Sequence, residues 1–419
     1  MIQVPSAKGR SGNRAMKTES GGSVRVEGYD APLKGILFSA STEMEFTTLI
    51  PLIKALDKEG NDWALIYDNK KTFGRFSSVL NSDRCISVEN ENLVRKIKTF
   101  GPEIFLTAHE GILLTVVLTS MMTSLGVPII YIPHGLISSK EMPNATRVQV
   151  WRSNSIAHLF KYFTIICKTR AITWVVSTKV FPLIFKRPQY QWSYALVYDE
   201  SAKAALLSKG VPEERVVVTG HPRLDGLSSQ SSGDSRSSTR VQYGVGEDEG
   251  FVLFMSQPFV EDKLLKIGEW GRTIDLLAKV THQPKIKVFI RPHPRESLDK
   301  FDMIRGTEIR LMNGSHPLQE ALAASDVVLT VNSTAALEAM SMGKPVISIF
   351  MDEVQGRAMT SLPEHIPVAK NEAELIELVG RSLTEPMVMS GHGGASGNDQ
   401  HDGATKRIIA FIDHILKDV

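Results

Sequence analysis

Residues 326–340 read Asp-Val-Val-Leu-Thr-Val-Asn-Ser-Thr-Ala-Ala-Leu-Glu-Ala-Met. The first half of this stretch is a short apolar run, which is typical of a strand buried on both faces. The second half has helical spacing and begins directly after the Asn-Ser-Thr turn. A buried strand that passes at once into a helix predicts a parallel α/β sheet.

The same alternation of short apolar runs and helical segments extends from Lys34 to the end of the chain. It is interrupted at 228–250, where seven serines lie between Ser228 and Ser238 and an acidic cluster follows. Such a composition is typical of a linker. The sequence therefore predicts the α/β class, with two Rossmann-like doubly wound domains facing across a cleft.

Five parts are expected along the chain. They are a disordered lead-in at 1–33, an N-terminal Rossmann-like domain at 34–227, a Ser-rich linker at 228–250, a C-terminal Rossmann-like domain at 251–403 and a closing helix at 404–419.

Composition excludes several classes of protein. The 419 residues contain 48 Lys and Arg against 46 Asp and Glu, which argues against a globally basic nucleic-acid binder. Two cysteines cannot build a disulfide framework or a Cys-rich zinc site. The start of the chain has no apolar secretory signal, and the uncharged run 111–133 is broken by Gly126-Val127-Pro128. We expect residues 111–133 to form a buried helix and a buried strand, with a membrane span as the alternative. For the protein as a whole we expect a cytoplasmic location.

Two turns of the second domain are candidates for binding phosphate. Val288-Phe289-Ile290-Arg291-Pro292-His293-Pro294 carries a strand into a rigid turn, where Arg291 can clamp a phosphate and His293 can donate to it. Asn332, Ser333 and Thr334 precede a helix whose first N–H groups can bind an anion, and Glu338 can accept from ribose hydroxyls. The alternatives are an ordinary surface turn and an ordinary helix cap.

The first domain offers candidates for acid–base chemistry. Glu110, in Thr107-Ala108-His109-Glu110-Gly111, can act as a general base or merely complement a helix dipole. His134 follows a neighbouring strand in Ile132-Pro133-His134-Gly135 and is either a second base or a structural histidine.

No metal-ligand constellation, Gly-x-Gly-x-x-Gly loop or phosphate-binding Gly-x4-Gly-Lys loop is found, so we expect neither a metal nor a resident cofactor.

The motifs resemble those of GT-B glycosyltransferases of the cell-surface polysaccharide type. His293-Pro294 is similar to the "HP" motif, and Ser333-Thr334 to the "S" motif, of bacterial sialyltransferases, capsule Kdo transferases and CDP-glycerol glycerophosphotransferases. Glu110 matches the second acid of their acidic motif, and His134-Gly135 resembles the His-Gly pair of the CDP-glycerol enzymes.

The resemblance implies a metal-independent glycosyltransferase of capsule or other polysaccharide biosynthesis. Its N-terminal domain would bind a glycan or lipid-linked acceptor. Its C-terminal domain would bind a CMP- or CDP-linked donor of sialic acid, Kdo or a polyol phosphate, with UDP as a further possibility. Glu110, His134 and His293 would be catalytic. Donor binding would fall to Arg291, His293, Pro294, Asn332, Ser333, Thr334 and Glu338, joined by Gly220, His221 and Arg223.

A competing resemblance is to the non-hydrolysing UDP-GlcNAc 2-epimerases, which share the GT-B fold. Gly220-His221-Pro222-Arg223, the stretch 332–346 and 402–408 all look like landmarks of these enzymes. Their second catalytic acid is missing here, because its turn reads Pro133-His134-Gly135-Leu136. An epimerase-like enzyme or a UDP-sugar transferase is therefore the alternative, and an inactive glycan-binding module is a third class.

The segment 142–198 contains eight basic residues, no acidic residue and three of the five tryptophans. This composition suits peripheral contact with an anionic membrane or an anionic glycan, and no nucleic-acid module accompanies it. The alternative is a packed helical region with a solvated basic rim.

Overall fold

The computed structural model describes residues 33–109, 113–135, 137, 192–225, 227, 233–351, 363, 365–385 and 403–418. The chain divides into two compact units. The first comprises Met1–His134, Ser139–Arg223 and Gly403–Val419, and the second Gly135–Ser138 and Leu224–Asp402. Each unit is described by itself.

The described part of the first unit is built on a seven-stranded parallel sheet in the order β3-β2-β1-β4-β5-β6-β7. The strands are β1 (Ile36–Ala40), β2 (Trp63–Tyr67), β3 (Cys85–Ser87), β4 (Ile104–Thr107), β5 (Ile129–Tyr131), β6 (Tyr194–Val197) and β7 (Val216–Val218). The helices are α1 (Glu43–Lys58), α2 (Lys70–Gly74), α3 (Leu93–Phe100), α4 (Leu113–Ser124), α9 (Glu200–Leu207) and α17 (Ala404–Asp418).

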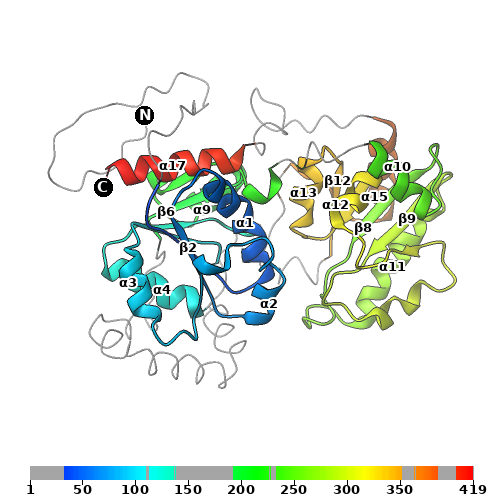
Figure 1. Cartoon of the computed structure of the whole chain (residues 1–419). Coiled ribbons are helices and arrows are strands. Elements are labelled where there is room, and N and C mark those ends of the chain that lie inside the picture. The colour runs from blue at the N-terminus through cyan, green and yellow to red at the C-terminus, as the bar shows by residue number, and fades with distance from the viewer. Residues whose placement is uncertain are drawn as a thin grey trace. The chain divides into compact units, whose positions relative to one another are not determined.

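Helices α1 and α17 cover one face of this sheet (Figure 1). Helix α1 begins with a capping box, in which the Thr42 hydroxyl accepts from the Glu45 N–H and the Glu45 carboxylate accepts from the Thr42 N–H. Helix α17 contributes Ile408 and Ile412, both fully buried, to the same core. The predicted closing helix thus belongs to the first unit, although it follows the whole second unit in the chain.

The second unit has a six-stranded parallel sheet among its described residues, in the order β10-β9-β8-β11-β12-β13. The strands are β8 (Gly250–Met255), β9 (Ile286–Arg291), β10 (Arg310–Leu311), β11 (Val327–Thr330), β12 (Val346–Ile349) and β13 (Val368–Ala369). The helices are α10 (Gly233–Gln242), α11 (Ile267–Thr281), α12 (Leu318–Ala324), α13 (Ala335–Ser341) and α15 (Glu372–Thr384).

These two sheets confirm the predicted fold class of two doubly wound α/β domains. In each sheet the strand order reverses beside a central strand, between β1 and β4 in the first unit and between β8 and β11 in the second. Loops that leave the carboxyl ends of the strands at such a switch point diverge to opposite faces, which leaves a crevice where ligands bind in this class of fold.

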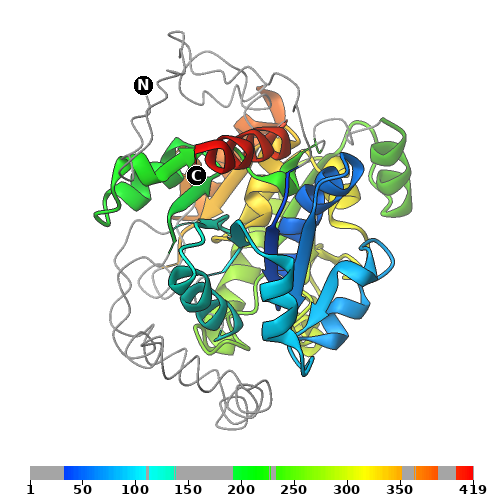
Figure 2. The same cartoon turned by 60° about the vertical axis from the view of Figure 1, so that its left-hand side comes forward.

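The Ser-rich segment is not simply a linker, because residues 233–242 form α10, which packs on α12 (Figure 2). The fully buried Arg240 side chain donates to the Asp326 carboxylate and to the carbonyls of Ala324, Gly246 and Glu249. Composition misled here because this helix is held by hydrogen bonds to its neighbours and not by apolar burial.

The predicted buried helix and strand within 111–133 are confirmed as α4 and β5. In the described part of the chain, no helix is long and apolar enough to cross a membrane. Most of the basic aromatic segment 142–198, up to residue 191, lies outside the described residues, so its proposed membrane contact stays a prediction.

Candidate functional site

Arg291 is the last residue of β9, and its side chain is held beside the switch point of the second sheet. Its Nη2 donates to the carbonyl of His316 at 2.9 Å. Its Nε is buried and has no hydrogen-bond partner among the described residues. Burial lowers the pKa of Arg291, while the carboxylate of Glu338 opposes this effect. The guanidinium therefore has one buried donor that no described residue accepts from.

His293 lies in the rigid turn that the sequence predicts, between the buried Pro292 and the exposed Pro294. Its backbone N–H donates to Glu296 Oε2 at 2.5 Å. Its ring Nδ1 accepts from the Arg295 N–H at 3.1 Å, so the neutral ring carries its proton on Nε2. Burial, followed by the charge of Arg295, lowers the pKa of His293. The turn thus presents an imidazole that donates through Nε2.

The Asn-Ser-Thr turn connects β11 to α13. The Ser333 hydroxyl accepts from the Ala335 N–H at 3.2 Å, as expected for a capping side chain. The geometric cap residue is Thr334, whose own side chain makes no capping bond. The Thr334 hydroxyl therefore does not cap the helix it precedes.

One residue that sequence reasoning missed, His316, lies beside Arg291. His316 is buried, accepts the Arg291 bond through its carbonyl, and sets its ring edge-on to Tyr243 with centroids 5.4 Å apart. Glu338, which the sequence did predict, is 5% exposed and acts electrostatically on Arg291. His316 has no motif of its own, since it reaches the site only through the loop between β10 and α12.

Residues at the end of β8 bond to both of the turns predicted to bind phosphate, and the sequence did not indicate this. Gln257 Nε2 donates to Asn332 Oδ1 at 2.6 Å, while the Asn332 N–H donates to Gln257 Oε1 at 3.0 Å. The preceding residue, Ser256, donates from its N–H to the Arg291 carbonyl at 3.1 Å. Neighbouring residues of one strand end thus bond to both turns across the switch point.

In the first unit, His134 follows β5 at the carboxyl edge of the sheet. Its Nδ1 lies 2.6 Å from the Ala108 carbonyl, which only accepts, so Nδ1 carries the proton and Nε2 the lone pair. Burial lowers the pKa of His134, and the charge of Arg223 lowers it further. The His109 ring stacks on His134 with centroids 5.1 Å apart. The neutral His134 ring thus has its lone pair on Nε2.

Gly220, His221 and Arg223 lie after β7 in the first unit, whereas the other predicted donor-binding residues lie in the second. His221 is buried. Its Nε2 donates to the Pro133 carbonyl at 3.0 Å, and its Nδ1 accepts from the Arg223 N–H at 3.2 Å. Both ring nitrogens are engaged with backbone, so His221 connects the turns after β5 and β7. Glu110 lies outside the described residues.

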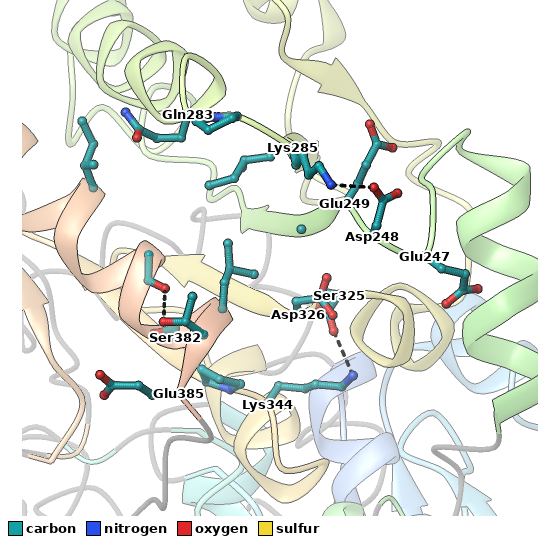
Figure 3. A pocket seen from close by; sticks show the side chains of 18 of the residues that line it. Glu247, Asp248, Glu249, Gln283, Lys285, Ser325, Asp326, Lys344, Ser382 and Glu385 are labelled. Atoms are coloured by element: carbon teal, nitrogen blue, oxygen red, sulfur yellow. Dashed lines mark hydrogen bonds and ion pairs between the residues drawn. The ribbon is translucent and has the colours of Figure 1, made fainter.

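A depression of about 740 Å³ lies at the opposite edge of the second sheet, where β8, β9, β11 and β12 begin (Figure 3). Lys344 and Asp326 line it, and Lys344 Nζ donates to the carbonyls of Ala323 and Ser325. Burial lowers the pKa of Lys344 to about 8. Lys344 thus bonds to the end of α12, and none of the predicted site residues lines this depression.

Two doubly wound parallel units define a GT-B-like fold, and the second unit places Arg291, His293, Ser333 and Glu338 toward the carboxyl edge of its sheet. The family model of UDP-N-acetylglucosamine 2-epimerase matches residues 193–412. The chain belongs to this family.

Solved structures share the fold. A putative UDP-N-acetylglucosamine 2-epimerase from Listeria monocytogenes aligns with a TM-score of 0.60 at 16% identity, covering 93% of this chain and 98% of its own. The UDP-GlcNAc 2-epimerase from Neisseria meningitidis bound to UDP-GlcNAc gives 0.57 at 16%, covering 90% and 99%. An Anabaena protein in complex with UDP and glucose gives 0.56 at 12%, covering 90% and 99%. A search of curated protein sequences gives no match.

These findings overturn the prediction of a CMP-sugar glycosyltransferase, and the alternative, an epimerase-like enzyme, fits better. The reason is chemical. The side chains of Arg291, His293 and Ser333 are of types that can bind phosphate, and every nucleotide sugar has phosphate. These motifs therefore carry no information about the base or the reaction.

Proposed function

We propose that the protein is a UDP-GlcNAc 2-epimerase-like enzyme that binds a UDP-N-acetylhexosamine and inverts its C2 centre. The observation that carries the proposal is the group of Arg291, His293 and Glu338 in the second unit, within the region matched by the family model. A guanidinium with a buried, unpaired Nε and an imidazole that donates through Nε2 suit a diphosphate. The buried Glu338 carboxylate suits ribose hydroxyls.

Inversion at C2 requires that a C–H bond be broken and remade, so the enzyme needs a proton acceptor. The absence of the family's second acid is what argued against an epimerase, because its turn contains His134. The Ala108 carbonyl fixes the His134 proton on Nδ1 and leaves Nε2 unprotonated. Burial favours the same neutral form. We propose that His134 takes the place of that acid.

Proton exchange tests this proposal directly. UDP-GlcNAc is incubated with the protein in D₂O, and NMR follows incorporation of deuterium at C2. His134→Gln should abolish exchange, since the amide cannot accept and return a proton. His365→Gln, which alters an exposed histidine, is the matched control and should exchange at the parent rate. Parent-like exchange by His134→Gln would exclude His134 as the base.

Nucleotide preference provides a second test. Thermal shift with UDP, CMP and CDP should show stabilisation by UDP above the others. His293→Ala and Ser333→Ala should each weaken UDP binding, His293→Ala by about 10- to 100-fold, because a hydrogen bond to a charged group contributes about 1.5–3 kcal/mol. Stabilisation by CMP alone would contradict the proposal. UDP binding without deuterium exchange at C2 would indicate that the protein binds the nucleotide but does not catalyse epimerisation.

We also propose that the reaction needs no metal ion, since Arg291 and His293 supply donors for the diphosphate. Activity measured before and after dialysis against EDTA should be equal. Loss of exchange that returns with added Mg²⁺ would show that a cation, and not these side chains alone, neutralises the phosphates.

A further inference from the structure

A buried ion pair lies directly beneath the His293 turn. The Glu296 side chain is 0% exposed and the Lys300 side chain 4% exposed, and Lys300 Nζ lies 2.6 Å from Glu296 Oε1. Buried Lys and Glu are expensive to desolvate and are kept where their geometry is fully satisfied. Neither residue was a candidate from the sequence, and neither belongs to the phosphate-binding groups described above.

The partners of Lys300 hold the ammonium in one place. It lies 3.1 Å from Glu261 Oε2 and 4.6 Å from the centre of the Trp270 ring, which is fully buried on α11. An ammonium over an indole face is a favourable cation–π arrangement. Apart from Glu296, the position of Lys300 is therefore fixed by Glu261 and by the core of the second unit.

The partners of Glu296 lead from that core to the ligand-binding turn. Its Oε1 accepts from the Ser256 hydroxyl at 2.6 Å, at the end of β8, as well as from Lys300. Its Oε2 accepts from the His293 N–H at 2.5 Å. The backbone of His293 is thus attached, through one carboxylate, to the strand end and to the buried lysine.

We propose that Glu296, held by Lys300, is a positioning residue that fixes the His293 turn and the direction of its imidazole. The role rests on the proposed function, because His293 is the group expected to donate to the diphosphate. Without the bond to Glu296, the His293 N–H is unpaired and the turn can rotate. The bond from the Arg295 N–H to His293 Nδ1, which selects the Nε2 proton, then weakens.

The test uses the full-length protein and reads the imidazole itself. Nitrogen NMR of the His293 ring, assigned from the spectrum of His293→Gln, reports which ring nitrogen carries the proton. The parent should hold the Nε2 tautomer, and Glu296→Ala should give a mixture of tautomers. A pH titration of the same ring signals should give a different His293 pKa in Glu296→Ala than in the parent. The charged groups that act on it are Arg295, Glu296, Asp262 and Arg291.

Two further variants keep the result interpretable, since Glu296→Ala leaves Lys300 with a single carboxylate and can impair folding. Glu296→Gln combined with Lys300→Met removes both charges and retains an amide oxygen for the His293 N–H, so it should keep the Nε2 tautomer. Lys285→Met breaks an exposed ion pair with Asp248 at the other edge of the sheet and is the control, expected to behave as the parent.

Titration with UDP measures the effect of each variant on nucleotide affinity. Glu296→Ala should weaken UDP binding about tenfold, and the double variant should restore most of it. A parent-like His293 tautomer in Glu296→Ala, or a double variant as altered as the alanine variant, would overturn the positioning role. A parent protein that does not bind UDP would defeat the proposed function instead, while the ring spectra would still decide the role of Glu296.

Discussion

Glu45 makes the stability of the first unit depend on pH in a way that can be calculated. The side chain is fully buried at the start of α1, where its Oε2 accepts from the N–H groups of Ser41 and Thr42. Its Oε1 is buried without a hydrogen-bond partner in the described part of the chain. Burial, the largest effect, raises the pKa of Glu45 from 4.5 to about 6.

This raised pKa converts into about 2 kcal/mol, at 1.36 kcal/mol for each pH unit. Because the folded state holds the Glu45 proton more tightly, the contribution is fully present below pH 4.5 and is lost as the pH rises through about 6. Glu45→Gln removes this titration and keeps an oxygen that can accept the capping bonds. The unfolding free energy of the variant minus that of the parent should therefore rise by about 2 kcal/mol between pH 4 and pH 7.

Urea denaturation at half-unit pH steps, followed by tryptophan fluorescence, measures this difference. Glu43→Gln is the matched control, because Glu43 lies on the same turn of α1 with its side chain 59% exposed. The control should leave the pH dependence of the parent in place. A difference between Glu45→Gln and the parent that stays constant from pH 4 to pH 7 would refute the reasoning.

Three further substitutions test the packing that supports the site. Arg240→Met should lower the unfolding free energy by about 3–5 kcal/mol in denaturant titrations, since it removes a buried charge paired with Asp326 and a donor to the carbonyls of Gly246 and Glu249. Gln257→Ala should lower the melting temperature measured by scanning calorimetry and weaken UDP binding, because it strips Asn332 of two bonds worth about 1 kcal/mol each. Ile412→Ala should lower the unfolding free energy in urea by about 2–5 kcal/mol. UDP affinity should not change, because Ile412 lies in the core of the first unit and the groups proposed to bind UDP lie in the second.

Much of the fold could be predicted because its signals are local. The apolar run from Asp326 to Val331 and the turn that follows it predict a strand, a cap and a helix without reference to the rest of the chain. Helix α10 could not be predicted in this way, because it has no such local signal. Its serines and arginines have no apolar face, and the helix is stabilised by Arg240 and Arg236, which bond to the end of α12 and to Asp326.

The residues of the candidate site also fall into two groups, those that the sequence could predict and those that it could not. Arg291, His293 and Ser333 could be found because each follows an apolar strand in a recognisable turn. His316 and Gln257 could not, since they reach the site through the strand order and carry no motif. Glu296 lies only three residues after His293, but it belongs to no motif. The motifs could not distinguish an epimerase from a CMP-sugar transferase for a further reason, because side chains that can bind phosphate suit every nucleotide sugar.

The return of α17 to the first unit governs the order in which the chain can fold during synthesis. Four isoleucines of α17 complete a core whose other buried members lie between Leu33 and Leu196, namely Ile408, Ile409, Ile412 and Ile415. A ribosome makes the whole second unit before it makes these isoleucines. The second unit can therefore finish folding while the first unit still exposes the apolar face of α1, which α17 later covers (Figures 1 and 2). A nascent chain stopped before residue 404 should bind chaperones through that face, and release should coincide with emergence of α17.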